Sequence, residues 1–123
     1  MRGLLIASAL TCLATPALGQ AASEPTPMRC EMGGIKRDFG GSTWIVYGCA
    51  DGASLIFVSD TGSPAMPFFF ILTPKDGAYL LTGEGNGDRT YTQAAYDDLK
   101  RLGEPEIEAL LAETSAAGPA QQN

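Results

Sequence analysis

The chain has 123 residues, 45% of them hydrophobic, with 14 acidic and eight basic side chains and a net charge of −6. This acidic balance argues against nucleic acid and anionic lipid head groups as partners, because like charges repel and release no counterions. The chain contains no histidine, which is the side chain most often used for acid–base catalysis. An enzyme is therefore not expected, and a hydrolase that relies on Asp and Glu alone is the remaining enzymatic alternative.

Residues 1–19 have the organisation of a secretory signal peptide. Arg2 precedes an apolar run over residues 4–14, a proline interrupts the sequence, and small residues close it. We expect cleavage between Gly19 and Gln20, which leaves 104 residues with a net charge of −7 and no membrane anchor. A retained anchor would need about 20 apolar residues, and this run is shorter. The protein is therefore expected to be exported, either to the periplasm or as a secreted protein.

Two cysteines, Cys30 and Cys49, remain after Cys12 is removed with the signal peptide. In an oxidising compartment, two cysteines in a small exported domain most simply form a disulfide. The alternative is a pair of thiols for redox chemistry or metal binding, but the chain has neither a C-x-x-C motif nor a histidine. The sequence therefore predicts a structural Cys30–Cys49 bond that ties the N-terminal segment to the centre of the fold.

The mature chain begins with a spacer and a short ribbon. Residues 20–28 are rich in proline and small side chains, which predicts a flexible spacer before a single domain over residues 29–114. Residues 29–32 and 35–39 alternate polar and apolar side chains on either side of two glycines. This pattern predicts two short strands joined by a glycine turn.

A central hairpin is the strongest structural signal. Two β-rich runs, residues 44–50 and 53–59, are joined by Asp51-Gly52, and tight turns need residues that accept positive φ. If these two residues form the turn, Ala50 pairs with Ala53. Both faces of the hairpin are then largely apolar, which indicates a position inside the sheet and not at its edge.

Two further strands and two helices complete the expected fold. Strands are predicted at residues 67–73, which contain Phe68-Phe69-Phe70, and at residues 78–82. A helix over about 91–102 follows a capping box formed by Thr90 and Gln93. A second helix begins near Pro105 and ends near Thr114, and residues 115–123 are predicted to be a disordered tail.

The fold class is therefore α+β, a small antiparallel β-meander of four to six strands followed by two C-terminal α-helices packed on the sheet. Two helices cover one face of the sheet. Because the opposite face is also apolar, the N-terminal ribbon or a partner is expected to cover it.

The loop between the last strand and the first helix offers a candidate calcium site. Glu84, Asn86 and Asp88 carry oxygen atoms at alternate positions, and calcium takes six to eight oxygen ligands. The match to a calcium loop is incomplete, since Arg89 and Ala95 stand where a glycine and a bidentate carboxylate are expected. The alternative is a plain strand-to-helix connection whose glycines supply positive φ. No cofactor is predicted.

Four side chains are candidates for contacts with a partner: Trp44, Asp60, Phe69 and Glu84. The two aromatic residues have core packing as their alternative. Acidic residues along the second helix are candidates for a docking face or for a solvated surface: Glu104, Glu106, Glu108 and Glu113.

The segment Tyr47-x-Cys49-x-Asp51-Gly52-x-x-Leu55 resembles the opening strands of the bacterial C-type lysozyme inhibitors of the envelope. It covers less than a tenth of the chain. The resemblance implies inhibition of lysozyme. No site residue is carried over, because the Ser-Gly-x-x-Tyr segment of those inhibitors is not evident and two C-terminal helices do not belong to their barrel.

We therefore expect a non-enzymatic accessory or interaction protein of the cell envelope, whose protein partner the sequence does not identify. The alternative is an inhibitor of an envelope-directed enzyme such as lysozyme. In that case the loops at residues 59–67 or 83–89 would carry the contact, and their acidic groups would suit a basic target.

Overall fold

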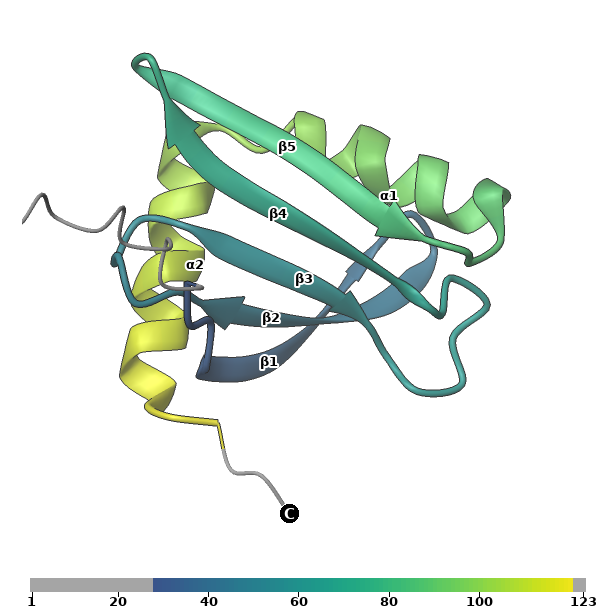
Figure 1. The fold of residues 1–123 in the computed structure, drawn as a ribbon, viewed down its shortest axis with the longest axis horizontal. Helices are drawn as coiled ribbons and strands as arrows, with labels where there is room; N and C mark the ends of the chain where they lie inside the picture. Colours follow the sequence, from purple (N-terminus) through teal and green to yellow (C-terminus); the bar gives the residue numbers. More distant parts are fainter. Residues whose placement is uncertain (1–27, 121–123) are drawn as a thin grey trace, which may run out of the picture.

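The computed structural model describes residues 28–120, and they form a five-stranded sheet followed by two helices (Figure 1). The strands pair in sequence order, all antiparallel: β1 (Met32–Phe39), β2 (Ser42–Gly48), β3 (Leu55–Ser59), β4 (Phe68–Lys75) and β5 (Ala78–Gly85). Helices α1 (Arg89–Lys100) and α2 (Glu104–Ala117) both lie behind the sheet in this view. The predicted α+β fold is confirmed. The predicted signal peptide and all but the last residue of the spacer lie outside the described residues.

The hydrophobic core lies between the sheet and the helices. Every second side chain of β2 and β3 is buried on this side, and Trp44, Leu55 and Phe57 have no exposed surface. Burying a large apolar side chain stabilises the fold by about 1.5–3 kcal/mol relative to leaving it in water. The remaining members of the core come from the sheet, from the loop before β4 and from both helices: Val46, Ala65, Phe70, Leu72, Leu81, Ala95, Leu99, Ile107 and Leu110.

β2 and β3 pair in the predicted register but over a shorter length. Gly48 lies opposite Leu55, which is the register that would pair Ala50 with Ala53. The strands stop there, so residues 49–54 form a six-residue loop in place of the expected two-residue turn.

The loop is wide because Asp51 binds its own neighbouring backbone. Its carboxylate accepts hydrogen bonds from the amides of Ala53 at 3.0 Å and Ser54 at 2.8 Å, and from the Ser54 hydroxyl at 2.5 Å. Such local bonds compete with a regular strand ladder. Partial burial acts to raise the pKa of Asp51, but the hydrogen bonds from Ser54 and Ala53 outweigh it and hold that pKa below its usual value.

The expected N-terminal ribbon is one strand, so that prediction is wrong. β1 continues through Gly33 and Gly34, where the register with β2 shifts. Both glycines have positive φ, 101° and 76°, which lets them form a β-bulge inside the strand instead of a turn. Because β1 lies beside β2 in the sheet, it does not cover the face opposite the helices.

The predicted disordered tail is wrong over residues 115–120. Helix α2 continues to Ala117, since small helix-forming residues extend it beyond Thr114. Pro119 then pairs with Met32, and the amide of Gly33 donates to the carbonyl of Gly118 at 2.7 Å. The tail is ordered because the backbone groups of β1 need partners at this edge. Residues 121–123 lie outside the described part.

Helix α1 begins two residues before its expected start because Asp88 caps it. The Asp88 carboxylate accepts a hydrogen bond from the amide of Thr90 at 2.9 Å, as N-cap residues do. The predicted capping box is therefore wrong: Gln93 donates instead to Asp97, one turn further along the helix.

The predicted disulfide between Cys30 and Cys49 is confirmed. It joins the segment before β1 to the end of β2, where the amide of Ala50 also donates to the carbonyl of Arg29 at 2.6 Å. The two cysteines are 19 residues apart, so the bond restricts the unfolded chain over that length.

Reducing the Cys30–Cys49 bond is expected to lower the free energy of unfolding by about 3 kcal/mol, because the unfolded chain regains the entropy of a loop of this length. Urea denaturation of the oxidised and reduced protein measures the difference. Reductant should not change the stability of the Cys30→Ala/Cys49→Ala variant. An equal urea midpoint for oxidised and reduced wild type would contradict the prediction.

Asp51→Ala is expected to lower the free energy of unfolding at pH 7 by about 1 kcal/mol through the lost hydrogen bonds. The folded-state pKa of Asp51 is depressed, so this contribution is present above the unfolded pKa of about 3.9 and is lost as the pH falls through the folded value. The difference in the free energy of unfolding between wild type and Asp51→Ala, measured by denaturation at each pH, should become smaller below about pH 4. Glu108→Ala, at an exposed position on α2, is the control. A gap of constant size at every pH would contradict the prediction.

Candidate functional site

The sheet has a second face that no described helix or strand covers. Both helices lie behind the sheet in Figure 1, and the face toward the viewer is open. We call this the outer face. Its central side chains come from β2, β3 and β4, are all apolar or aromatic, and are only half buried: Ile45, Tyr47, Ile56, Val58, Phe69 and Ile71.

The strand register arranges the outer face in two rows that cross the sheet. The first row runs through directly paired residues from β1 to β5, in the order Lys36, Ile45, Val58, Phe69 and Glu84. The second row contains, from β2 to β5, Tyr47, Ile56, Ile71 and Thr82. Directly paired side chains lie about 5 Å apart, so each row is a continuous contact surface. The first row is apolar in the middle and has opposite charges at its ends.

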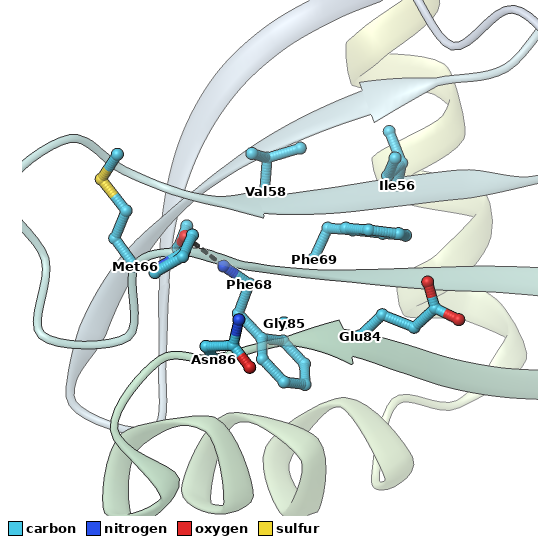
Figure 2. A pocket seen from close by; sticks show the side chains of 10 residues that line it. Ile56, Val58, Met66, Phe68, Phe69, Glu84, Gly85 and Asn86 are labelled. Atoms are coloured by element: carbon cyan, nitrogen blue, oxygen red, sulfur yellow. Dashed lines mark hydrogen bonds between the residues drawn. The ribbon is translucent and has the colours of Figure 1, made fainter.

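The outer face is hollowed at one end into a pocket of about 560 Å³. Figure 2 shows Ile56, Val58 and Phe69 side by side on β3 and β4, with Glu84 beside Phe69. Met66 also borders the pocket and is 48% exposed. The lining is thus mainly apolar, with Ser59, Glu84 and Asn86 as its polar residues.

Two loops meet beside this pocket. The amides of Asn86 and Gly87, which follow β5, donate to the carbonyl of Pro67 at 2.9 Å and 3.1 Å. Gly87 is required at this contact, since a Cβ there would lie 1.8 Å from the carbonyl oxygen of Ala65. The loops expected as candidate inhibitor contacts, residues 59–67 and 83–89, therefore form one continuous surface.

Two of the candidate calcium ligands have structural roles in this loop, whereas Glu84 lies in β5, which continues past its predicted end at residue 82 to Gly85. Glu84 lies in the outer face, the backbone of Asn86 binds Pro67, and the carboxylate of Asp88 caps α1. Within residues 28–120, no group of three His, Cys, Asp or Glu side chains lies close enough together to hold a metal ion. The strand-to-helix connection, the alternative expected from the sequence, accounts for the contacts of Asn86 and Asp88.

The candidate partner contacts divide between the core and the outer face. Trp44 has no exposed surface, and its Nε1 donates to the Ser42 hydroxyl at 3.0 Å, so its assignment to an interaction surface is wrong. Phe69 and Glu84 are neighbours in the first row. Asp60 follows β3 and pairs with Lys36 at 3.2 Å, so it lies at the border of the outer face.

Sequence reasoning did not propose the other side chains of the outer face as contacts with a partner. The signal was present, because β2 and β3 are apolar on both sides while two short helices cover one side only. What the sequence did not reveal was that β1 lies in the plane of the sheet and leaves the outer face uncovered.

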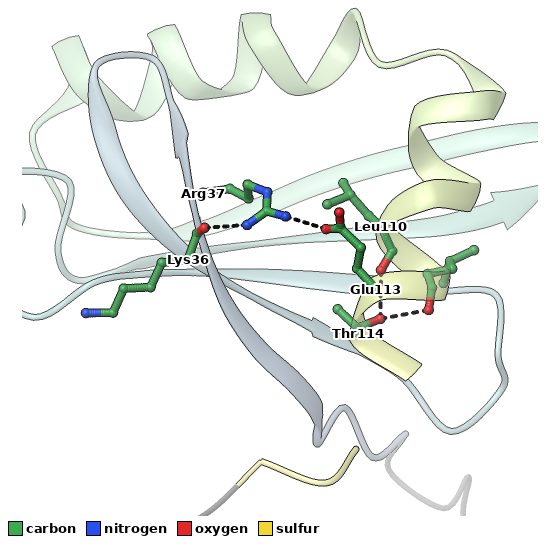
Figure 3. A network of polar contacts seen from close by, with 6 residues as sticks. Lys36, Arg37, Leu110, Glu113 and Thr114 are labelled. Atoms are coloured by element: carbon green, nitrogen blue, oxygen red, sulfur yellow. Dashed lines mark hydrogen bonds and ion pairs between the residues drawn. The ribbon is translucent and has the colours of Figure 1, made fainter. Parts of the chain in front are cut away.

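The acidic face of α2 is partly used to hold this helix on the sheet (Figure 3). Glu113 pairs with Arg37 of β1, and the Arg37 guanidinium also donates to the carbonyl of Lys36 at 2.9 Å. Glu106 accepts the amide of Gly103 at 2.8 Å and caps the helix. These carboxylates therefore act within the fold.

Close contact between α2 and the sheet depends on Thr114, which is 1% exposed. Its hydroxyl donates to the carbonyls of Leu110 at 2.9 Å and Leu111 at 3.0 Å (Figure 3). A Cβ at Gly48 would lie 2.6 Å from this hydroxyl. The absence of a side chain at Gly48 lets the helix approach, and a packed core tolerates little extra volume.

No helix within residues 28–120 combines the length and the apolar character needed to cross a membrane. In comparisons with known proteins, no family, no curated protein and no solved structure matches this chain. The described sheet is open, since β1 and β5 are not paired with each other, unlike the barrel of the C-type lysozyme inhibitors that residues 47–55 resemble.

Proposed function

We propose that this protein is a non-enzymatic accessory protein of the cell envelope that binds another protein through its outer face. The observation that carries the proposal is the pair of apolar rows on a face that no described element covers. Antiparallel sheets with one solvated face normally place polar side chains there. A contiguous apolar surface in a small domain is typical of a binding site.

The energetics favour a complex that also uses the charged residues at the ends of the first row. Completing the burial of six half-buried side chains stabilises a complex by roughly 1 kcal/mol each, or about 6 kcal/mol in total. Association itself costs about 4–15 kcal/mol in lost translational and rotational freedom. The apolar rows therefore need additional polar contacts. Lys36 and Glu84, at the two ends of the first row, can supply them.

Export supports a partner in the envelope. The Cys30–Cys49 bond is consistent with an oxidising compartment, and residues 1–19 have the pattern of a signal peptide. We place the mature protein in the periplasm or among secreted proteins. A hydrolase is less favoured, because Glu84 is the single carboxylate among the pocket-lining residues, whereas hydrolysis by carboxylates alone typically uses two.

The variant Ile56→Thr/Val58→Thr tests the outer face. Threonine keeps the β-branched shape that strands favour and removes apolar contact surface. Mature protein from Gln20 onward is crosslinked in a cell-envelope extract, and captured proteins are identified by mass spectrometry. We expect the double variant to lose a protein that the wild type captures.

Glu108→Thr is the control, because it also introduces threonine at an exposed position, but on α2, which lies on the other side of the sheet from the outer face. It should capture the same protein as the wild type. Equal capture by the wild type and the double variant would exclude the outer face as the binding site.

Inhibition of lysozyme is a second candidate function. The observation that favours it is the contact between the segments at residues 59–67 and 83–89, which makes them one surface beside the pocket. Glu84 lines the pocket and Asp60 lies at the border of the outer face beside Lys36, and acidic groups suit a basic target.

An inhibitor should lower the rate of lysozyme-catalysed cell-wall lysis when it is present at about one molecule per enzyme molecule. Asp60→Asn/Glu84→Gln should weaken this inhibition, because the charge complementarity is lost. A lytic rate that stays constant at a large molar excess of the wild-type protein would exclude this function.

A further inference from the structure

We propose that the outer face binds the outer face of a second copy of the chain, in a two-fold symmetric dimer with sheet packed on sheet. This inference rests on the proposed function, which makes the outer face a binding surface, and names its partner. The argument comes from the order of side chains along the two rows.

In this dimer the two sheets face each other, and the two-fold axis between them runs parallel to the strands. The axis reverses the order of the strands in the second sheet but leaves each residue at the same position along its strand. β1 of one copy then lies over β5 of the other, and β3 lies over β3 at the axis. Each row of one copy therefore faces the same row of the other copy, with its residues in reverse order. A two-fold interface of this kind must be complementary to itself.

The first row meets this requirement. Lys36 faces Glu84 of the second copy, and Val58 faces its own equivalent at the axis. Ile45 faces Phe69, so an apolar side chain meets an aromatic ring on both sides of the axis. The reversed row thus pairs opposite charges at both ends and apolar groups between them.

The second row is complementary in the same arrangement. Tyr47 faces Ile71, and Ile56 faces its own equivalent. A two-fold axis that lies in the interface but runs perpendicular to the strands would instead place β1 over β1 and β5 over β5. In that arrangement Lys36 of one copy does not face Glu84 of the other. Charge complementarity therefore selects the axis parallel to the strands.

Lys36 is placed to take part in both an internal and an intermolecular ion pair. Its ammonium lies 3.2 Å from the Asp60 carboxylate, yet its side chain is 67% exposed. In the dimer, each Lys36 would lie between Asp60 of its own chain and Glu84 of the other. This arrangement also offsets the repulsion between the two Asp60 carboxylates, which follow β3 close to the axis.

The size of the face predicts a reversible dimer. Five strands about 4.8 Å apart, paired over about five residues of 3.3 Å each, give a flat footprint of roughly 400 Å². A standard stable interface buries about 800 Å² on each partner. Packed sheets cross at about 30°, which shifts the outermost strands by roughly 5 Å, a distance that a lysine side chain spans. We therefore expect dissociation constants in the micromolar range or weaker.

Charge exchange between two copies tests this dimer. Sedimentation of the wild-type mature protein from 1 μM to 1 mM should show a concentration-dependent dimer. Glu84→Lys and Lys36→Glu should each weaken self-association by about tenfold or more. In each variant the two ends of the first row carry the same charge, so like charges face each other across the dimer. An equimolar mixture of the two variants should associate again, because one variant presents two positive ends and the other presents two negative ends.

Glu108→Lys makes the same change in net charge on the exposed side of α2 and should dimerise like the wild type. Thermal melting of each variant separates loss of the interface from loss of the fold. A wild type that stays monomeric at 1 mM, or a variant mixture that does not associate, would overturn the dimer. If the protein is monomeric but Ile56→Thr/Val58→Thr still abolishes capture of an envelope protein, the proposed function stands without self-association. If neither is observed, both proposals fail.

Discussion

An antiparallel strand sends alternate side chains to opposite faces, and this constraint determines most of the molecule. In β2 and β3 both sets are apolar, so each strand needs cover on two sides. The helices supply it on one side, where Trp44, Leu55 and Phe57 become fully buried. The other side retains Ile45, Ile56 and Val58, which are only half buried by their neighbours in the sheet. The same pattern therefore produces both a packed core and an apolar surface.

The N-terminal segment shows how two glycines decide whether the outer face is covered. Gly33 and Gly34 adopt positive φ and form a bulge, so β1 continues as an edge strand beside β2. Because the bulge keeps the chain in the plane of the sheet, the apolar rows remain accessible. The Cys30–Cys49 bond then holds the start of this edge strand against the end of β2.

The sequence was sufficient to predict features that depend on local pattern. The order of the four strands after the N-terminal ribbon, the register of the central hairpin, the disulfide and the two helices all follow from alternation, turn residues and apolar spacing. It was insufficient where neighbouring side chains compete to bind the same backbone groups. Asp51 widens the hairpin loop through bonds to Ala53 and Ser54, and Asp88 replaces Thr90 as a helix cap. For the candidate site, the sequence named Phe69, Glu84 and Trp44 as possible contacts with core packing as the alternative for the two aromatic residues, and it could not assign each aromatic residue to a face of the sheet.

The short pairing between Pro119 and Met32 has a consequence for how sheets of this kind can associate. Growth into a fibre by addition of strands needs two unoccupied edges, one on each side of every sheet. At the start of β1 the chain supplies its own extra strand residues, since Gly33 donates to Gly118 and Ala120 donates to Glu31. Over residues 31–33 this edge is already paired by residues 118–120 and is not open to a strand of another chain. Residues 118–120 thus shorten the edge on which a fibre could grow.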